Sequence, residues 1–236
     1  SGQAYRRGGP HPPAPVRHAL ILAAGRGERM RPLTDHTPKP LLMAGGKPLI
    51  VWHLEKLADA GIRYVVINTS HLADRFEPML GSGDRWGVRI RYSYEGLEPL
   101  ETGGGMLRAL PLLGPEPFVA LSADIHTDYD YARLPVEPKG LVHLVMVPNP
   151  EWHAGGDFFL DGDRLHDSGP GERLTFGNIG IYRRALVEDH KPGCFKLGPL
   201  YRQAMAAGQA SGERFDGHWT NVGTPAQLAA LNEALR

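Results

Sequence analysis

Residues 20–40 constrain this chain more than any other stretch, because they join a buried strand to a glycine turn and several cations. The apolar run Ala19–Ala24 is too short for a buried helix and predicts a strand. In the turn that follows, Gly25 and Gly27 are expected to take positive φ and to let the backbone approach a ligand. The nearby cations are Arg26, Arg29, Arg31 and Lys39. Backbone N–H groups and cations together predict a polyphosphate site.

Two common glycine loops are excluded. The dinucleotide fingerprint needs a glycine at position 30, where this chain has Met30, and no Gly-Lys-Ser/Thr follows as a P-loop requires. A simple strand-to-loop turn with solvated cations is the alternative. That alternative explains the two glycines, but it does not explain why Arg31 and Lys39 each stand beside prolines.

Bulk composition narrows the function classes. The formal net charge of the 236 residues is zero, which argues against nucleic acid or an anionic membrane as a partner. The single cysteine, Cys194, excludes an intrachain disulfide framework and suits a cytoplasmic protein. No run approaches the roughly 18 apolar residues of a membrane span. Residues 1–17, rich in proline and glycine, are expected to be a disordered tail or a cloning remnant.

Strands and helices alternate along the rest of the chain. A helix is predicted from Pro48 to Gly61 and a buried strand over Tyr64–Thr69, with His53 expected on the helix surface or in the core rather than as a ligand. This alternation predicts an α/β fold with a mostly parallel sheet and helices on both faces. Gly103–Gly105 precede a helical pattern and are expected to present backbone amides at its start.

Asp124 ends a further buried strand, Pro117–Asp124. The carboxyl ends of inner strands border the crevice where open α/β sheets bind ligands. A carboxylate there is a suitable Mg²⁺ ligand, and a turn or helix-cap role is the alternative.

The motif around the turn, L-x-x-G-x-G-x-R-M-x-P-L-T followed by P-K-P, resembles that of the sugar-1-phosphate nucleotidyltransferases. The loop L-E-T-G-G-G at residues 100–105 resembles one branch, the N-acetylmuramate-1-phosphate uridylyltransferases of peptidoglycan recycling, although Glu101 stands where glycine is more usual. The resemblance covers residues 18–236. It implies a Rossmann-like three-layer sandwich in a single domain, with a nucleotide half over about 18–126 and a sugar half over about 127–236.

The resemblance also implies roles for particular residues. Arg31 is expected to bind the β- and γ-phosphates and Lys39 to bridge the α-phosphate and the sugar phosphate. Asp124 and Asn221 are the expected Mg²⁺ ligands, although Asn221 stands where the family usually has aspartate. Asp157 and Asn178 are expected to bind the sugar. Nucleotide contacts are expected from Leu22, Ala24, Gly25, Gly27, Glu28, Arg29, Gly103 and Gly104.

The expected reaction is Mg²⁺-dependent transfer of UMP from UTP to a sugar 1-phosphate, by a monomer or homodimer. Two alternatives remain open at this point. One is a guanylyl- or thymidylyltransferase acting on mannose or glucose 1-phosphate. The other is a catalytically silent nucleotide-sugar sensor, which Asn221 favours because an amide lacks the negative charge of a carboxylate.

Overall fold

Four parallel strands form one half of the sheet, and the glycine motif follows the first of them in the chain. The computed structural model describes residues 15–236. Residues 1–14 of the tail predicted for residues 1–17 therefore lie outside the described residues. The four strands stand in the order β5–β4–β1–β6 and share a direction, so their carboxyl ends lie at one edge. Their bounds are β1 His18–Leu22, β4 Tyr64–Thr69, β5 Arg89–Tyr94 and β6 Phe118–Ser122.

Five further strands complete a nine-stranded sheet in the order β5-β4-β1-β6-β11-β8-β12-β10-β9. Their bounds are β8 Val142–Val147, β9 Phe158–Asp161, β10 Arg164–His166, β11 Glu172–Tyr182 and β12 Ala210–Arg214. β11 runs antiparallel to β6, β8 and β9, while β12 is parallel to β8. The predicted α/β class is confirmed, but the sheet is mixed, so the expectation of a mostly parallel sheet is wrong for this half.

A short connection explains one antiparallel pair. Residues 162 and 163 alone join β9 to β10, whereas a crossover between parallel strands needs about a dozen residues or more. Residues 167–171 then lead to β11, which pairs with β9 on its other side, so β10 and β11 flank β9 in the same direction.

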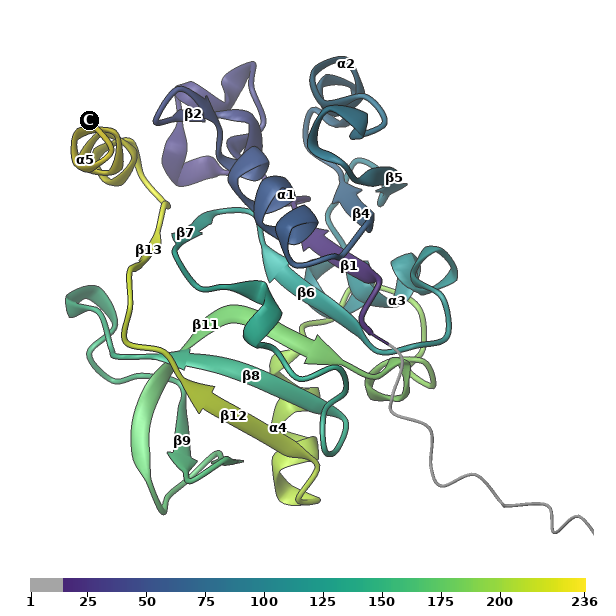
Figure 1. Cartoon of the computed structure of the whole chain (residues 1–236), viewed down its shortest axis with the longest axis vertical. Helices are drawn as coiled ribbons and strands as arrows, with labels where there is room; N and C mark the ends of the chain where they lie inside the picture. Colours follow the sequence, from purple (N-terminus) through teal and green to yellow (C-terminus); the bar gives the residue numbers. More distant parts are fainter. Residues whose placement is uncertain (1–14) are drawn as a thin grey trace, which may run out of the picture.

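Helices cover both faces of the sheet, as predicted (Figure 1). α1 and α2 pack on one face, whereas α3 and α4 pack on the other. The helix bounds are α1 Leu49–Asp59, α2 Phe76–Leu80, α3 Glu101–Leu113, α4 Gly198–Ala206 and α5 Pro225–Ala234. Leu54 and Leu57 of α1 are fully buried, and truncating either to alanine costs about 2–5 kcal/mol of stability by the usual core values.

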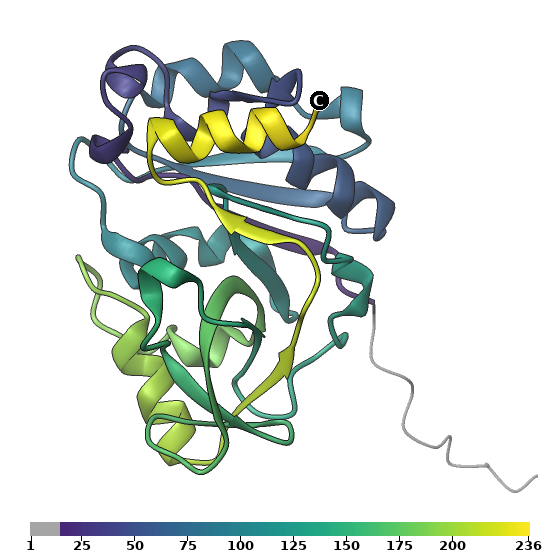
Figure 2. The ribbon, with the colours of Figure 1, turned by 90° about the vertical axis from the view of Figure 1, so that its left-hand side faces the viewer.

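The C-terminal helix reaches back to the N-terminal motif (Figure 2). Leu228 and Leu231 of α5 form a small core with Met30 and Leu49, which ties α5 to the loop after β1. The segment before α5 contains β13 (Trp219–Asn221), which pairs with β7 (Ile125–Thr127) directly after β6. Residues far apart in the chain therefore meet at the carboxyl edge of the parallel strands.

The shorter elements lie in the connections. β2 (Met43–Ala44) and β3 (Lys47–Pro48) pair with each other ahead of α1. The 3-10 turns are η1 Glu28–Met30, η2 Leu33–Asp35, η3 Lys39–Leu41, η4 Ala73–Arg75, η5 Asp84–Trp86, η6 Tyr131–Arg133, η7 Glu151–His153 and η8 Arg184–Leu186. None of the helices within residues 15–236 combines the length and apolar character that a membrane crossing requires.

His53 lies in the core, one of the two positions expected for it. Its Nε2 lies 2.7 Å from the Ile125 carbonyl oxygen and its Nδ1 lies 2.7 Å from the Tyr131 hydroxyl. A carbonyl only accepts, so Nε2 carries the proton and the neutral ring accepts from Tyr131 at Nδ1. Burial, followed by the charge of Lys56, lowers the pKa of His53 to about 3.

Candidate active site

Gly27 is the residue on which the loop after β1 turns. Its φ is +64°, a conformation that favours glycine, and a Cβ built there would lie 3.0 Å from Thr34 and 3.3 Å from Lys39. The Thr34 hydroxyl donates to the Gly27 carbonyl at 2.7 Å, which closes the loop. The expectation of positive φ is wrong for Gly25, because its φ is ordinary. A Cβ at Gly25 would meet nothing within 4 Å, so this glycine leaves space at the cavity wall.

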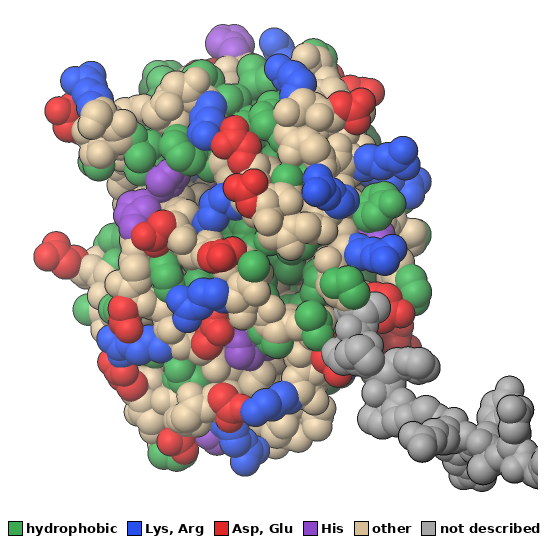
Figure 3. Space-filling view, viewed as in Figure 1, with side chains coloured by type: hydrophobic (Ala, Val, Ile, Leu, Met, Phe, Trp, Pro, Cys, Tyr) green, Lys and Arg blue, Asp and Glu red, His purple; other side chains and the backbone are tan. Residues whose placement is uncertain are grey.

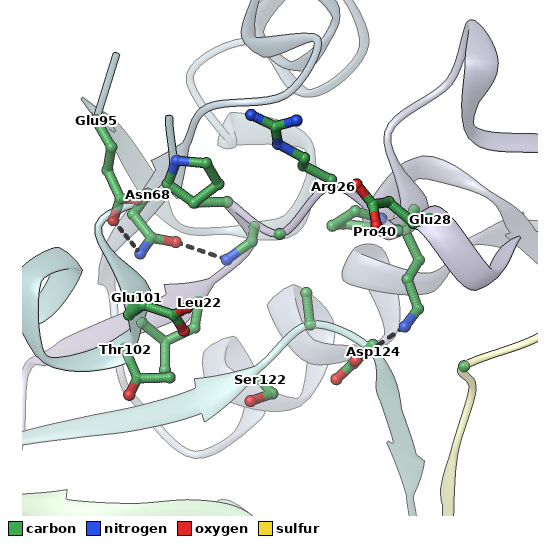
Figure 4. Close-up of a pocket in the computed structure, with 18 of the residues that line it drawn as sticks. Leu22, Arg26, Glu28, Pro40, Asn68, Glu95, Glu101, Thr102, Ser122 and Asp124 are labelled. Carbon is green, nitrogen blue, oxygen red and sulfur yellow. Dashed lines mark hydrogen bonds and ion pairs between the residues drawn. The ribbon is translucent and has the colours of Figure 1, made fainter. Parts of the chain in front are cut away.

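The loop after β1 places Lys39 in contact with Asp124. The Lys39 Nζ donates to Asp124 Oδ2 at 3.0 Å, and the lysine side chain is only 12% exposed. Figure 4 marks this ion pair at Asp124, and both residues line a cavity of about 760 Å³. The sequence placed both residues in the site, and the structure brings them into contact.

The wall of this cavity, called the main cavity below, is rich in charge. Its cations are Arg26, Arg29 and Lys39, and its acids are Glu28, Glu95, Glu98, Glu101 and Asp124. Arg26 and Glu98 form an ion pair at 2.5 Å. Carboxylates outnumber cations, so a polyanion in the main cavity meets net repulsion unless a further cation accompanies it.

Arg31 lies beside the main cavity rather than in its wall. It lines an adjoining hollow of about 490 Å³ that shares Arg26, Glu28 and Glu98 with the main cavity. Its Nε donates to Asp35 Oδ1 at 2.7 Å, and 68% of its side chain is exposed. The role expected for Arg31 at the β- and γ-phosphates stays a prediction.

Asp124 and Asn221 lie on neighbouring segments, as the expectation of a shared metal site requires. The Val222 N–H donates to the Asp124 carbonyl at 2.8 Å, and Asn221 pairs with Ile125 in the β7–β13 ladder. A Cβ on the bare Gly223 would touch both Asn221 and Arg29, at 3.2 and 3.1 Å. Within residues 15–236 no group of three or more His, Cys, Asp or Glu side chains forms a ready-made metal cluster.

The glycine triplet lies inside the first turn of α3, not ahead of the helix as predicted. The N–H groups of Gly103 and Gly104 both donate to the Phe195 carbonyl, at 2.9 and 3.0 Å. A Cβ at Gly104 would lie 2.1 Å from the Gly193 carbonyl oxygen. The triplet therefore permits close packing against residues 193–195. Direct contact of these amides with a nucleotide stays a prediction and requires Phe195 to move away.

Two smaller hollows, each of about 370 Å³, continue from the main cavity toward the sugar half. The first shares Leu22, Glu101, Thr102 and Ser122 with the main cavity. Asn178 lines both hollows and has φ +58° at the irregular step of β11. Asp157 lines the second hollow, where it binds His153 Nε2 at 2.8 Å and accepts from the Phe176 N–H at 2.8 Å. The two residues expected to bind the sugar thus share one surface.

Comparison with known proteins settles the family. Residues 18–137 match the family model described as nucleotidyl transferase. The chain is 44% identical to N-acetylmuramate alpha-1-phosphate uridylyltransferase of Neisseria meningitidis, over 89% of this chain and 94% of that protein. The chain belongs to the nucleotidyl transferase family. A second relative, the enzyme of the same name from Caulobacter vibrioides, is 36% identical over 90% of this chain and 94% of its own length.

The fold of this nucleotidyltransferase is shared with solved structures. The inositol-1-phosphate CTP transferase from T. maritima superposes with a TM-score of 0.73, covering 94% of this chain and 97% of that chain. At 16% identity this likeness concerns the fold alone. It confirms the α/β fold expected of a nucleotidyltransferase.

Sequence reasoning missed one buried pair in this nucleotidyltransferase. Asn68, 2% exposed, accepts from the Ala23 N–H at 2.6 Å and donates to Glu95 Oε1 at 2.9 Å (Figure 4). Glu95 Oε2 accepts from the Leu100 N–H at 3.0 Å, and burial raises the pKa of this carboxyl. The pair fixes the loop after β1 relative to the loop before α3. The signal that could have found Asn68 is a polar residue near the carboxyl end of a buried strand.

Proposed function

We propose that this nucleotidyltransferase transfers UMP from UTP to N-acetylmuramate 1-phosphate, yielding UDP-N-acetylmuramate and pyrophosphate. The meeting of Lys39 and Asp124 in the main cavity carries the proposal, because it puts an ammonium group where the two phosphates would react. Similarity to two uridylyltransferases over nearly the whole chain supports the choice of base and acceptor. We further propose that the reaction takes place in the cytoplasm and serves peptidoglycan recycling.

The reaction needs little acid–base chemistry. An oxygen of the sugar phosphate forms a bond to the α-phosphorus of UTP, and the bond from that phosphorus to the β-phosphate oxygen breaks to release pyrophosphate. The acceptor oxygen is already anionic at neutral pH, so no general base is required. The chain must instead bring two anions together and offset their charge.

Lys39 is suited to that task. It lines the main cavity from the 3-10 turn η3, and its side chain is nearly buried. An ammonium group at low exposure interacts strongly with phosphate oxygens, because little water screens it. Arg29, in the cavity wall near Asn221, adds positive charge on the side of the C-terminal segment.

The donor set fits Mg²⁺. Asp124 offers a carboxylate and Asn221 an amide oxygen, which are hard oxygen ligands, and Mg²⁺ often binds through one or two protein groups plus substrate phosphates. The excess of acids in the cavity wall also favours a divalent cation beside a triphosphate. When bound, the ion supplies charge neutralisation at the phosphates.

A panel assay tests the proposal. Purified protein with Mg²⁺ is given UTP, GTP, dTTP or CTP, each with N-acetylmuramate, N-acetylglucosamine, mannose or glucose 1-phosphate, and pyrophosphate release is measured. UTP with N-acetylmuramate 1-phosphate is expected to give the highest kcat/KM. A preference for GTP or dTTP with mannose or glucose 1-phosphate would favour the alternative transferases, and a protein inert with every pair would favour the sensor.

A further inference from the structure

The two hollows beside the main cavity form one continuous surface, which we call the acceptor groove. Both hollows are lined by Phe176, Asn178, Gly198, Tyr201 and Arg202. Because the first hollow also shares wall residues with the main cavity, a sugar whose phosphate lies at Lys39 extends into this groove. The groove therefore faces the parts of the sugar away from its phosphate.

Arg202 lines both hollows of the acceptor groove and places a positive charge there. It follows Tyr201 on α4, and its Nη1 lies 3.5 Å from the point where a Cβ on Gly198 would stand. The side chain thus folds back over the first turn of α4, the direction that helical side chains prefer. Lys196, the other cation at the groove, lines only the hollow that adjoins the main cavity.

No acidic side chain in the described part of the chain pairs with Arg202. Other arginines of the sugar half are engaged, since Arg183 pairs with Glu137 and Arg214 pairs with Glu172 and Asp216. Arg202 has no ion-pair or hydrogen-bond partner among residues 15–236. The one carboxylate of the second hollow, Asp157, is already bound by His153 and the backbone of residue 176.

We propose that Arg202 binds a carboxylate on the acceptor sugar and so selects N-acetylmuramate 1-phosphate over N-acetylglucosamine 1-phosphate. This inference rests on the proposed function. The two sugars differ only in the lactyl ether at C3, two carbons along the ring from C1, so its carboxylate lies apart from the C1 phosphate. The two anions of the acceptor then match two separate cations, Lys39 in the main cavity and Arg202 in the acceptor groove. A guanidinium is suited to the distal anion because its planar fork pairs with a carboxylate through two hydrogen bonds.

The test compares the two acceptors in wild type and Arg202→Gln, with UTP held constant. We expect Arg202→Gln to lower kcat/KM for N-acetylmuramate 1-phosphate by about 10- to 100-fold, mainly through KM, as for the loss of a charge-assisted pair. Turnover of N-acetylglucosamine 1-phosphate and the KM for UTP are expected to change less than about twofold, because neither substrate offers a carboxylate at this point. Arg202→Lys is expected to restore part of the preference, since it keeps the charge but not the fork.

Two controls sharpen the test. Lys191→Gln removes an exposed cation from the same segment outside every hollow described here and is expected to leave both acceptors unaffected. The second control is the lactyl methyl ester of N-acetylmuramate 1-phosphate, which lacks the negative charge of the carboxylate. With wild type, its kcat/KM is expected to be as low as that of N-acetylmuramate 1-phosphate with Arg202→Gln.

Three results would overturn the role of Arg202. These are an equal loss for both acceptors in Arg202→Gln, no loss for either, and a selective loss in Lys196→Gln instead. Failure of the proposed function is separately visible, because wild type would then transfer UMP to neither sugar.

Discussion

Lys39 Nζ lies 3.0 Å from Asp124 Oδ2, although the two residues are 85 positions apart in the chain. The contact joins the loop after β1 to the segment after β6, and these two strands are parallel neighbours in the sheet. It brings the expected phosphate-binding cation and the expected metal ligand to one point, so both can act on the same phosphate.

Replacing Lys39 with alanine is expected to lower kcat by about 100- to 1,000-fold, the usual range for loss of one charge-stabilising group. Folding should persist, because the Asp124 side chain it leaves is one-third exposed and can be solvated. Steady-state pyrophosphate release and a thermal melt measure the two effects. Lys47→Ala is the matched control, because Lys47 pairs with Glu55 at 2.6 Å outside the main cavity. Wild-type turnover in Lys39→Ala would remove this residue from the mechanism.

Asn221→Asp is expected to reduce the Mg²⁺ concentration for half-maximal activity by roughly tenfold, because it adds a carboxylate beside Asp124. Titration of activity with Mg²⁺ after chelator treatment provides the measurement. Activity that survives complete chelation in wild type would contradict the metal proposal. An inert wild type that becomes active as Asn221→Asp would instead establish the sensor.

Two glycine-to-alanine variants distinguish a glycine that permits close packing from a glycine that leaves space for a ligand. Gly104→Ala is expected to destabilise the protein by about 1–3 kcal/mol, because the new methyl group would meet the Gly193 carbonyl. Gly25→Ala has open space and ordinary φ, so stability should change by less than about 0.5 kcal/mol while activity falls, since the methyl group enters the main cavity. Urea unfolding and turnover distinguish them. A stability loss in Gly25→Ala that exceeds the loss in Gly104→Ala would refute this assignment.

Glu101 has φ +62° at the first residue of α3, a strained conformation for a residue with a Cβ. Glu101→Gly should therefore be more stable than Glu101→Ala by about 1 kcal/mol, since only glycine relieves the strain. Chemical denaturation of both variants checks this. If alanine proves the more stable of the two, the backbone at Glu101 is not left-handed in solution.

His53 should make stability fall in acid. Its pKa is lowered from 6.5 to about 3 in the fold, so between these values the unfolded chain binds more protons. Stability therefore decreases as pH falls from 6.5 toward 3, by up to about 1.4 kcal/mol per pH unit. His53→Gln should therefore show a shallower pH dependence of unfolding than wild type in urea denaturation between these two pKa values. Identical slopes in the two proteins would contradict this.

Local sequence patterns predicted the elements of the nucleotide half well, because each element is formed by a short continuous segment with a clear hydrophobic pattern. The strand Tyr64–Thr69 has the bounds that were predicted, and the helix expected from Pro48 to Gly61 is α1. The glycine motif and its P-K-P extension pointed to Lys39, and the carboxyl end of a buried strand pointed to Asp124. The structure brings these two residues into contact.

The rest depended on long-range packing. β11 pairs antiparallel with β6 and β8, and no local pattern of its residues predicts these partners. The glycine triplet packs against residues 193–195, which no nearby sequence pattern reveals. Arg202 stands on an ordinary amphipathic helix, and only the lining of two adjoining hollows singles it out.

The nucleotidyl transfer itself is tested most directly by ³¹P NMR of wild-type protein mixed with Mg²⁺, UTP and N-acetylmuramate 1-phosphate. We predict that the signals of UDP-N-acetylmuramate and pyrophosphate grow in equal amounts as both substrates are consumed. Substrate signals that persist unchanged, under conditions where the protein is folded, would contradict the account.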